Sequence, residues 1–263
     1  MATRVGVVTG SSSGIGRQIA IELAEDGFDI VVHAARNMEG ANEVANLVRQ
    51  TGREALVVQQ DFSDARLLDD FVKRCWDWKS SVDVFVNNAG ADVLTGDAVA
   101  WDFETKLNAV LQVDVVATLV LSRDIGKRMR DAFAKDSVRR SIINIGWDQA
   151  KQGMAGDSGE MFAASKGAIM AASKSLAQSL APGVRVNCIA PGWIQTSWGE
   201  GASSEWQSVA KHDSLLERWG TPQDVAAIAR FLASESAEFI NGQVICANGG
   251  FRYGGQSLNT NKE

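Results

Sequence analysis

The sequence predicts an α/β fold in which helices cover both faces of one doubly wound parallel sheet. Short β-branched runs alternate with longer stretches of helical periodicity, which is the rhythm of strand–helix–strand units. The short runs are almost entirely apolar, as in strands buried on both faces of a parallel sheet. A glycine-rich turn separates the first run from the first helix. We expect the 263 residues to form a single domain, since α/β folds of this size often have one core.

The N-terminal half contains four of the expected strands. Glycine ends the first strand and opens the first helix, and apolar runs with β-branched residues mark the later strands. We expect strands at residues 5–9, 29–33, 55–59 and 82–86, and helices at 14–26 and 67–76.

The C-terminal half continues the same order. We expect strands at 141–145, 184–189 and 243–246, and helices at 160–180 and 222–234. The polar tail at 254–263 is expected to fray. No internal repeat or low-complexity linker divides the chain, so the single-domain interpretation stands.

Composition argues against several classes of partner. A net charge of −6 offers no general attraction to nucleic acid or to anionic membranes, and no apolar run reaches the ~18 residues that span a bilayer. The three cysteines, Cys75, Cys188 and Cys246, are far apart and form no CxxC pair, so neither a disulfide framework nor a metal site is expected. The N-terminus lacks a signal pattern, and we predict a cytoplasmic protein.

The first glycine-rich turn predicts a dinucleotide site. Its sequence from Thr9 to Gly16 reads TGSSSGIG and lies between the first strand and the first helix. Glycines allow a tight turn and a close approach to a pyrophosphate, and the N–H groups of the following helix face that anion.

Together with three later segments, this turn resembles the short-chain dehydrogenase/reductase family. The segments are Asn87-Asn88-Ala89-Gly90, the Asp61 that follows the third strand, and residues 187–192 (NCIAPG), and the likeness covers about residues 5–250. The resemblance implies a Rossmann-like fold and a nicotinamide cofactor. The cofactor-binding residues that it implies are Gly10, Ser12, Ser13, Gly14, Ile15, Gly16, Asp61, Phe62, Asn88, Ala89, Gly90, Lys166, Pro191, Gly192, Ile194 and Thr196.

The end of the second strand favours NADP(H) over NAD(H). Residues 31–37 read VVHAARN, with no acidic residue to hold a ribose 2′-hydroxyl. Arg36 stands near that position, and its guanidinium can pair with a 2′-phosphate.

The expected reaction centre departs from the family pattern. The resemblance implies a serine, a tyrosine, a lysine and an asparagine; this chain has Phe162 for the tyrosine, keeps Lys166, and has Asp114 for the asparagine. The serine position falls on Trp147 by strand alignment, or on Gln149 by counting back thirteen residues from position 162. A phenyl ring cannot donate a proton, so any catalysis needs an altered proton path.

Several groups are candidates for that path. Asp114 is expected to act either as a buried acid or, more simply, as an ion-pair partner of Lys166. Asp148, Asp157 and Glu160 lie on a lengthened loop before Phe162 and are expected either to face the pocket or to be solvated. Tyr253 is the only tyrosine, and it would act only by entering a neighbouring subunit's site.

An aromatic-rich segment predicts the substrate class. Trp193, Trp198, Trp206 and Trp219 follow the PG dipeptide, and the resemblance makes residues 193–216 a mobile substrate-binding segment. With Trp147 and Phe162 they would wall a pocket for an apolar, cyclic or aromatic small molecule. The alanine-rich helix at 160–180 predicts a homo-dimer or homo-tetramer, as the family commonly forms through this element.

Two functions therefore remain open. The first is an NADP(H)-dependent oxidoreductase acting on a small carbonyl or alcohol; the second is a catalytically silent NADP(H)-binding protein that serves as a sensor or structural partner. Substrate identity and reaction direction do not follow from the sequence.

Overall fold

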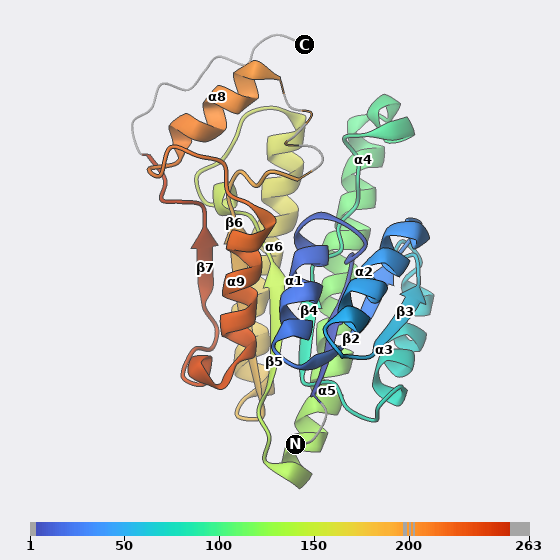
Figure 1. Ribbon diagram of the computed structural model, residues 1–263. Coiled ribbons are helices and arrows are strands. Elements are labelled where there is room, and N and C mark those ends of the chain that lie inside the picture. The colour runs from blue at the N-terminus through green and yellow to red at the C-terminus, as the bar shows by residue number, and fades with distance from the viewer. Residues whose placement is uncertain (1–3, 197–198, 200, 202, 253–263) are drawn as a thin grey trace.

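A computed structural model describes residues 4–252 of the chain, apart from 197, 198, 200 and 202. One sheet of seven parallel strands, in the order β3-β2-β1-β4-β5-β6-β7, runs through the molecule with helices on both faces (Figure 1). The predicted fold class is confirmed. The predicted polar tail at 254–263 lies outside the described residues.

The strands are short and the helices longer, as their sequence patterns predict. The strands are β1 (Arg4–Val8), β2 (Phe28–Ala34), β3 (Ala55–Gln59), β4 (Val84–Asn87), β5 (Arg140–Ile145), β6 (Val184–Pro191) and β7 (Val244–Ala247). The main helices are α1 (Gly14–Glu25), α2 (Met38–Gln50), α3 (Leu68–Asp77), α4 (Phe103–Val110), α5 (Ala117–Asp136), α6 (Asp157–Leu180), α8 (Ser204–Asp213) and α9 (Pro222–Ala233).

Predicted and observed bounds differ at the element ends. β3 has its predicted bounds, and most other ends shift by one or two residues, where capping geometry rather than periodicity decides. Helix α6 begins three residues before the expected position 160, because its first turn takes in the polar residues from Asp157 onward. The chain between α4 and α5 forms a π-helical turn, Leu111–Val116, which no periodicity predicts.

The core lies on both faces of the sheet. On one face Val8, Ile30 and Ile143 pack with α1, α2 and α9; on the other, Val7 and Ile142 pack with α3, α5 and α6. Every residue of β2 is buried, which explains its lack of polar alternation.

The strand order indicates which edge of the sheet can bind a ligand. The chain first builds outward from β1 through β2 to β3 and then returns to add β4 on the other side of β1. Ligands of open parallel sheets bind outside the carboxyl ends of the strands, at such a switch point. The turns that follow β1, β4, β5, β6 and β7 all open onto that edge, because the strands are parallel.

Candidate functional site

The turn between β1 and α1 is packed against the end of β4. Gly10 has a φ of +62°, and a Cβ on it would lie 2.8 Å from Ala89 Cα. A Cβ on Gly16 would lie 2.4 Å from both the carbonyl oxygen of Gly10 and the side-chain nitrogen of Asn88. Only glycine meets these demands, so the turn is built for close backbone approach.

The start of α1 leaves its amide groups available for an anion. The N-cap residue, Ser13, makes no side-chain capping bond, and the first turn of the helix contains no acidic residue. A Cβ on Gly14 would lie 3.5 Å from Thr196, which brings that predicted residue to the turn. Ser12 and Ile15 complete the turn and the helix start. These residues fit the pyrophosphate of a dinucleotide.

Thr9, which sequence reasoning did not single out, fastens β1 to β4. Its hydroxyl oxygen accepts hydrogen bonds from the backbone N–H groups of Asn88 (2.9 Å) and Ala89 (3.0 Å). The Asn88 side chain donates in return to the carbonyl oxygens of Thr9 and Gly10, each at 3.0 Å. The predicted residues Asn88 and Ala89 therefore adjoin the glycine turn.

His33 supports this turn through a hydrogen bond with Gly10, a role that the sequence did not indicate. The backbone N–H of Gly10 donates to His33 Nδ1 at 2.9 Å, and His33 Nε2 lies 2.9 Å from the carbonyl oxygen of Gln60. The ring stacks on Phe62, with centroids 4.3 Å apart. Nδ1 accepts and Nε2 donates, so the imidazole is neutral, and burial lowers its pKa to about 4.

Arg36 is presented to solvent beside Asp61. Its side chain is 90% exposed, and its nearest charged partner is Asp61, with Nη2 3.9 Å from Oδ2. A hydrogen bond from the backbone N–H of Ser63 is the main cause that lowers the pKa of Asp61. An exposed pair at this distance is weak, so Arg36 can turn to an incoming phosphate at little cost.

Lys166 and Asp114 form a buried ion pair at the carboxyl edge of β4. Lys166 Nζ lies 2.7 Å from Asp114 Oδ2, and the Asp114 side chain is only 2% exposed. Asp114 Oδ1 accepts a hydrogen bond from the backbone N–H of Ala91 at 2.8 Å, and a Cβ on Gly90 would lie 3.2 Å from the carboxylate. The π-helical turn carries Asp114 to this position. Of the two roles expected for Asp114, the geometry matches the ion pair.

The rings of Phe162 and Trp147 lie against one another in the predicted reaction centre. Their ring centroids are 6.5 Å apart in an edge-to-face arrangement, and both side chains are half-buried. Gln149, the other candidate for the serine position, is buried. Phe162 lies one helical turn before Lys166 on α6, so the two side chains lie on the same face of the helix.

The carboxylates of the lengthened loop separate into two groups. Asp157 and Glu160 are exposed in the first turn of α6, as solvated residues would be. Asp148 is instead only 3% exposed, and its Oδ2 accepts a hydrogen bond from Asn248 Nδ2 at 2.9 Å. Burial raises the pKa of Asp148.

Trp193, Trp206 and Trp219 form a cluster beyond β6. The Trp193 ring lies 5.3 Å from Trp206 and 6.2 Å from Trp219 between centroids, and Trp193 Nε1 donates to Asp213 Oδ2 at 3.3 Å. Pro191 ends β6, Gly192 follows it, and Ile194 bridges to Gly220. Trp198 and Tyr253 lie outside the described residues, as does part of the predicted 193–216 segment.

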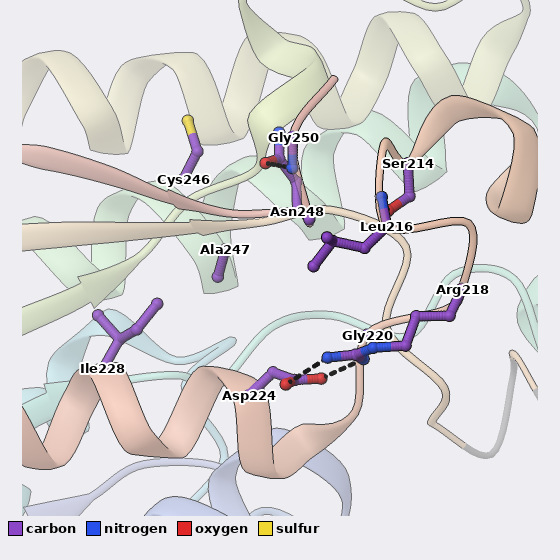
Figure 2. A pocket seen from close by; sticks show the side chains of 11 residues that line it. Ser214, Leu216, Arg218, Gly220, Asp224, Ile228, Cys246, Ala247, Asn248 and Gly250 are labelled. Atoms are coloured by element: carbon purple, nitrogen blue, oxygen red, sulfur yellow. Dashed lines mark hydrogen bonds and ion pairs between the residues drawn. The ribbon is translucent and has the colours of Figure 1, made fainter. Parts of the chain in front are cut away.

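A cavity of about 380 Å³ opens beside β7 (Figure 2). Its lining includes Asn248 at the end of β7, Ile228 on α9, and the ion pair of Arg218 with Asp224. Among the described residues that line it, none comes from α6, so this cavity is separate from Lys166 and Phe162. No group of three or more metal-ligating side chains occurs in the described chain. Each described helix is too short or too polar to cross a bilayer.

Comparisons with known proteins agree with this geometry. Residues 9–252 match the family described as enoyl-(acyl carrier protein) reductase. The chain is 32% identical to the 3-oxoacyl-(acyl-carrier-protein) reductase FabG of Staphylococcus aureus over 94% of this chain and 98% of that protein. It is 36% identical to the 2-dehydro-3-deoxy-D-gluconate 5-dehydrogenase of Pseudoalteromonas atlantica over 94% of this chain and 95% of that one.

A solved structure shows the same architecture. The short-chain dehydrogenase of Burkholderia cenocepacia in complex with NADP superimposes with a TM-score of 0.83 at 28% identity, covering 94% of this chain and 97% of that chain. The fold, the glycine turn and these relatives lead to one conclusion: the chain belongs to the short-chain dehydrogenase/reductase family of oxidoreductases.

Proposed function

We propose that the protein is an NADP(H)-dependent oxidoreductase that acts on a small apolar or cyclic carbonyl compound or alcohol. The observation that carries the proposal is that the glycine turn and Lys166 lie at the same carboxyl edge of the sheet. Glycine at positions 10 and 16, where a Cβ would meet backbone at 2.4 to 2.8 Å, gives the turn the tight form that lets its amide groups approach a pyrophosphate.

Arg36 supports the preference for NADP(H). Its guanidinium is exposed at the end of β2, close to Asp61 and Phe62, where the adenosine half of a dinucleotide lies in such folds. A 2′-phosphate there would receive a charge-assisted pair that NAD(H) lacks. The related dehydrogenase solved with NADP is consistent with this assignment.

In this proposal each of the residues at the site has its own role. The β1–α1 turn holds the pyrophosphate, Lys166 holds the ribose next to the nicotinamide, and Asp114 fixes the position of the lysine through the 2.7 Å ion pair. The cofactor, when bound, supplies or accepts the hydride. Phe162 and Trp147 form an apolar wall that excludes water from the reacting carbon.

The aromatic side chains support an apolar or ring-shaped substrate. Phe162, Trp147 and Trp193 come from the ends of three different elements toward the same edge of the sheet. Large flat rings offer contact area with little loss of entropy on binding. The named relatives act on a 3-oxoacyl chain and on a sugar acid, so the family relationship alone does not select the substrate.

Single-turnover kinetics test the proposal. The protein would be mixed with NADPH and a panel of small cyclic, aromatic and aliphatic ketones, and the loss of NADPH absorbance followed at several pH values. We expect hydride transfer to at least one ketone. Tight NADPH binding with no transfer to any ketone at any pH would reject the enzyme function.

That result would favour the second candidate, a silent NADP(H)-binding protein. The observation in its favour is the replacement of hydroxyl groups at positions 147 and 162 by aromatic rings, with Lys166 engaged by Asp114. A sensor of this kind would change its stability or assembly on NADPH binding, which thermal denaturation with and without the nucleotide would measure.

We further propose a homo-dimer or homo-tetramer in the cytoplasm. Ala164 and Ala171 form part of an exposed small-residue face of α6, and Trp101 and Phe103 are exposed near the start of α4. The cysteines are all free, which suits a reducing compartment. Light scattering on a size-exclusion column would give the oligomeric state, and a monomer at micromolar concentration would contradict this part of the proposal.

A further inference from the structure

Reduction of a carbonyl needs a proton for its oxygen, and the two rings that replace hydroxyl groups cannot supply one. Phe162 has no polar atom, and the indole N–H of Trp147 is a hydrogen-bond donor but not an acid in the physiological range. Both carboxylate oxygens of Asp114 already have partners, because one pairs with the Lys166 ammonium and the other accepts the backbone N–H of Ala91. Asp157 and Glu160 are exposed. Of the four carboxyl groups that the sequence offered as candidates, that of Asp148 remains.

Asp148 lies where three neighbouring strands end. It follows the turn after β5, its partner Asn248 directly follows β7, and a Cβ on Gly192, directly after β6, would lie 3.2 Å from Asp148 Oδ2. The turn of Asp148–Ala150 packs against α6, the helix that carries Phe162 and Lys166. Trp147, the immediate neighbour of Asp148, contacts Phe162. The carboxyl group is therefore built into the edge that holds the predicted reaction centre.

The hydrogen bonds around Asn248 decide which oxygen of Asp148 can carry a proton. The backbone N–H of Gly250 donates to Asn248 Oδ1 at 3.0 Å, which fixes the orientation of the amide. Asn248 Nδ2 must then donate to Asp148 Oδ2, as the 2.9 Å distance shows. A proton on Oδ2 would oppose this donor, so a neutral Asp148 carries its proton on Oδ1.

Asp148 Oδ1 is buried, and no group in the described part of the chain meets hydrogen-bond geometry with it. A buried carboxylate oxygen without a partner is costly, whereas a neutral carboxyl group costs much less. An O–H group at this atom is a donor with no acceptor in the described residues. Because the atom is closed to solvent in this structure, a substrate oxygen would reach it only after the side chains around it move apart.

The groups around Asp148 shift its pKa in both directions, and the net shift is upward. Burial is the largest influence and raises its pKa; the Asn248 side chain and nearby backbone amides lower it, and the Asp213 carboxylate at the end of α8 raises it further. The neighbours from β6 and β7, Gly192 and Asn248, are uncharged. On α6, Lys166 is neutralised by Asp114.

We propose that Asp148 is the catalytic acid of this site and that its Oδ1–H takes over the role of the absent tyrosyl hydroxyl toward the oxygen of a small ketone. The proposal rests on the proposed reductase function. The carbonyl carbon accepts a hydride from reduced nicotinamide as its C=O π bond breaks, and the carbonyl oxygen takes the Asp148 proton. The products are an alcohol, oxidised nicotinamide and the Asp148 carboxylate, which regains a proton from solvent. Asn248 stabilises that carboxylate through Oδ2.

The test compares D148N with the wild-type protein and with D157N, a matched change at an exposed carboxylate of the same region. We expect D148N to lower the single-turnover rate of ketone reduction by ~10²- to 10⁴-fold, while NADPH affinity changes less than twofold and D157N leaves both unchanged. The wild-type rate should fall as pH rises through the Asp148 pKa, and D148N should lose that dependence.

Infrared spectroscopy gives a readout that does not depend on activity. The nucleotide-free wild-type protein should show a protonated-carboxyl band that titrates at a pH above the usual aspartate range and is missing from D148N. A second variant, D148N combined with F162Y, covers the case in which D148N disturbs the fold. Recovery of reduction in that double variant would show an intact site that lacked only its acid.

The outcomes separate the two proposals. If the wild-type protein reduces a ketone and D148N does so at the same rate with the same pH profile, Asp148 is not the acid, and the reductase function stands. If the wild-type protein transfers no hydride, the proposed function fails, and the role of Asp148 fails with it.

Discussion

Lys166 Nζ lies 2.7 Å from Asp114 Oδ2, in a pair that leaves the carboxylate almost completely buried. The other carboxylate oxygen accepts the backbone N–H of Ala91, so both oxygens of Asp114 are engaged. An asparagine, the residue that the family resemblance implies here, could satisfy Ala91 only by turning its amide N–H₂ toward the Lys166 ammonium. The replacement by aspartate therefore converts a repulsive contact into an attractive one.

The first prediction concerns the stability that this pair provides. Removal of one partner from a buried pair leaves an uncompensated charge, so D114A should lower the free energy of unfolding by about 3–5 kcal/mol. D114N keeps an acceptor for Ala91 but places an amide N–H₂ group against the Lys166 ammonium, so it should cost about as much. Urea denaturation would measure both, with D77N at the exposed Lys73–Asp77 pair as the control, expected below about 1 kcal/mol. A D114A cost no larger than that of D77N would show that the pair is not important for stability.

The features that could be predicted from the sequence are mostly local. The glycine turn depends on the backbone conformations of neighbouring residues, which their sequence shows directly. The position of Lys166 depends on helix α6, in which it lies. The contacts that distinguish Asp148 from the other candidate carboxyl groups are not local. Asn248 donates a hydrogen bond to Asp148 across a separation of 100 residues, which no periodicity reveals. The role of His33 depended on the tertiary placement of Gly10 and could not be read from a strand pattern.

The second prediction concerns cofactor selection by Arg36. Because its exposed guanidinium has only a 3.9 Å contact to Asp61, R36A should leave folding unchanged. Loss of a charge-assisted hydrogen bond worth about 1.5–3 kcal/mol should weaken NADPH binding by roughly 10- to 150-fold and leave NADH binding nearly unchanged. Fluorescence titration with each nucleotide would measure this, and R66A at an exposed ion pair provides a control. Equal effects on both nucleotides would remove Arg36 from the 2′-phosphate role.

The third prediction uses the lowered pKa of His33. Folding holds this pKa at about 4, below the ordinary value of 6.5, so protons bind the unfolded chain more readily than the folded one. The contribution of His33 is fully present above pH ~6.5 and should decline by up to about 3 kcal/mol as pH falls toward 4. Protonation would also place a donor against the N–H of Gly10 and weaken nucleotide binding.

The matched variant for this effect is H33N, which offers Gly10 an acceptor but does not titrate. Unfolding free energies of both proteins between pH 7 and 4 would be compared, because other carboxyl groups titrate equally in the two. The wild-type value should fall relative to H33N as the pH decreases. Parallel curves would mean that the imidazole is not held in its neutral form.

The fourth prediction restores the missing hydroxyl at position 162. Phe162 stands one turn before Lys166 and lies edge to face with Trp147, with 6.5 Å between ring centroids, so a tyrosine would place its hydroxyl on the face of α6 that carries Lys166. A positioned general acid typically contributes ~10²- to 10⁴-fold, so in the D148N protein, which lacks the proposed acid, F162Y should raise the single-turnover rate of ketone reduction by about 10²-fold. F162L, which lacks the hydroxyl, is the control and should show no gain. If F162Y were no faster than F162L, the ion pair of Lys166 with Asp114 would have removed the lysine from the reach of a phenol, and the chain would rely on an acid elsewhere.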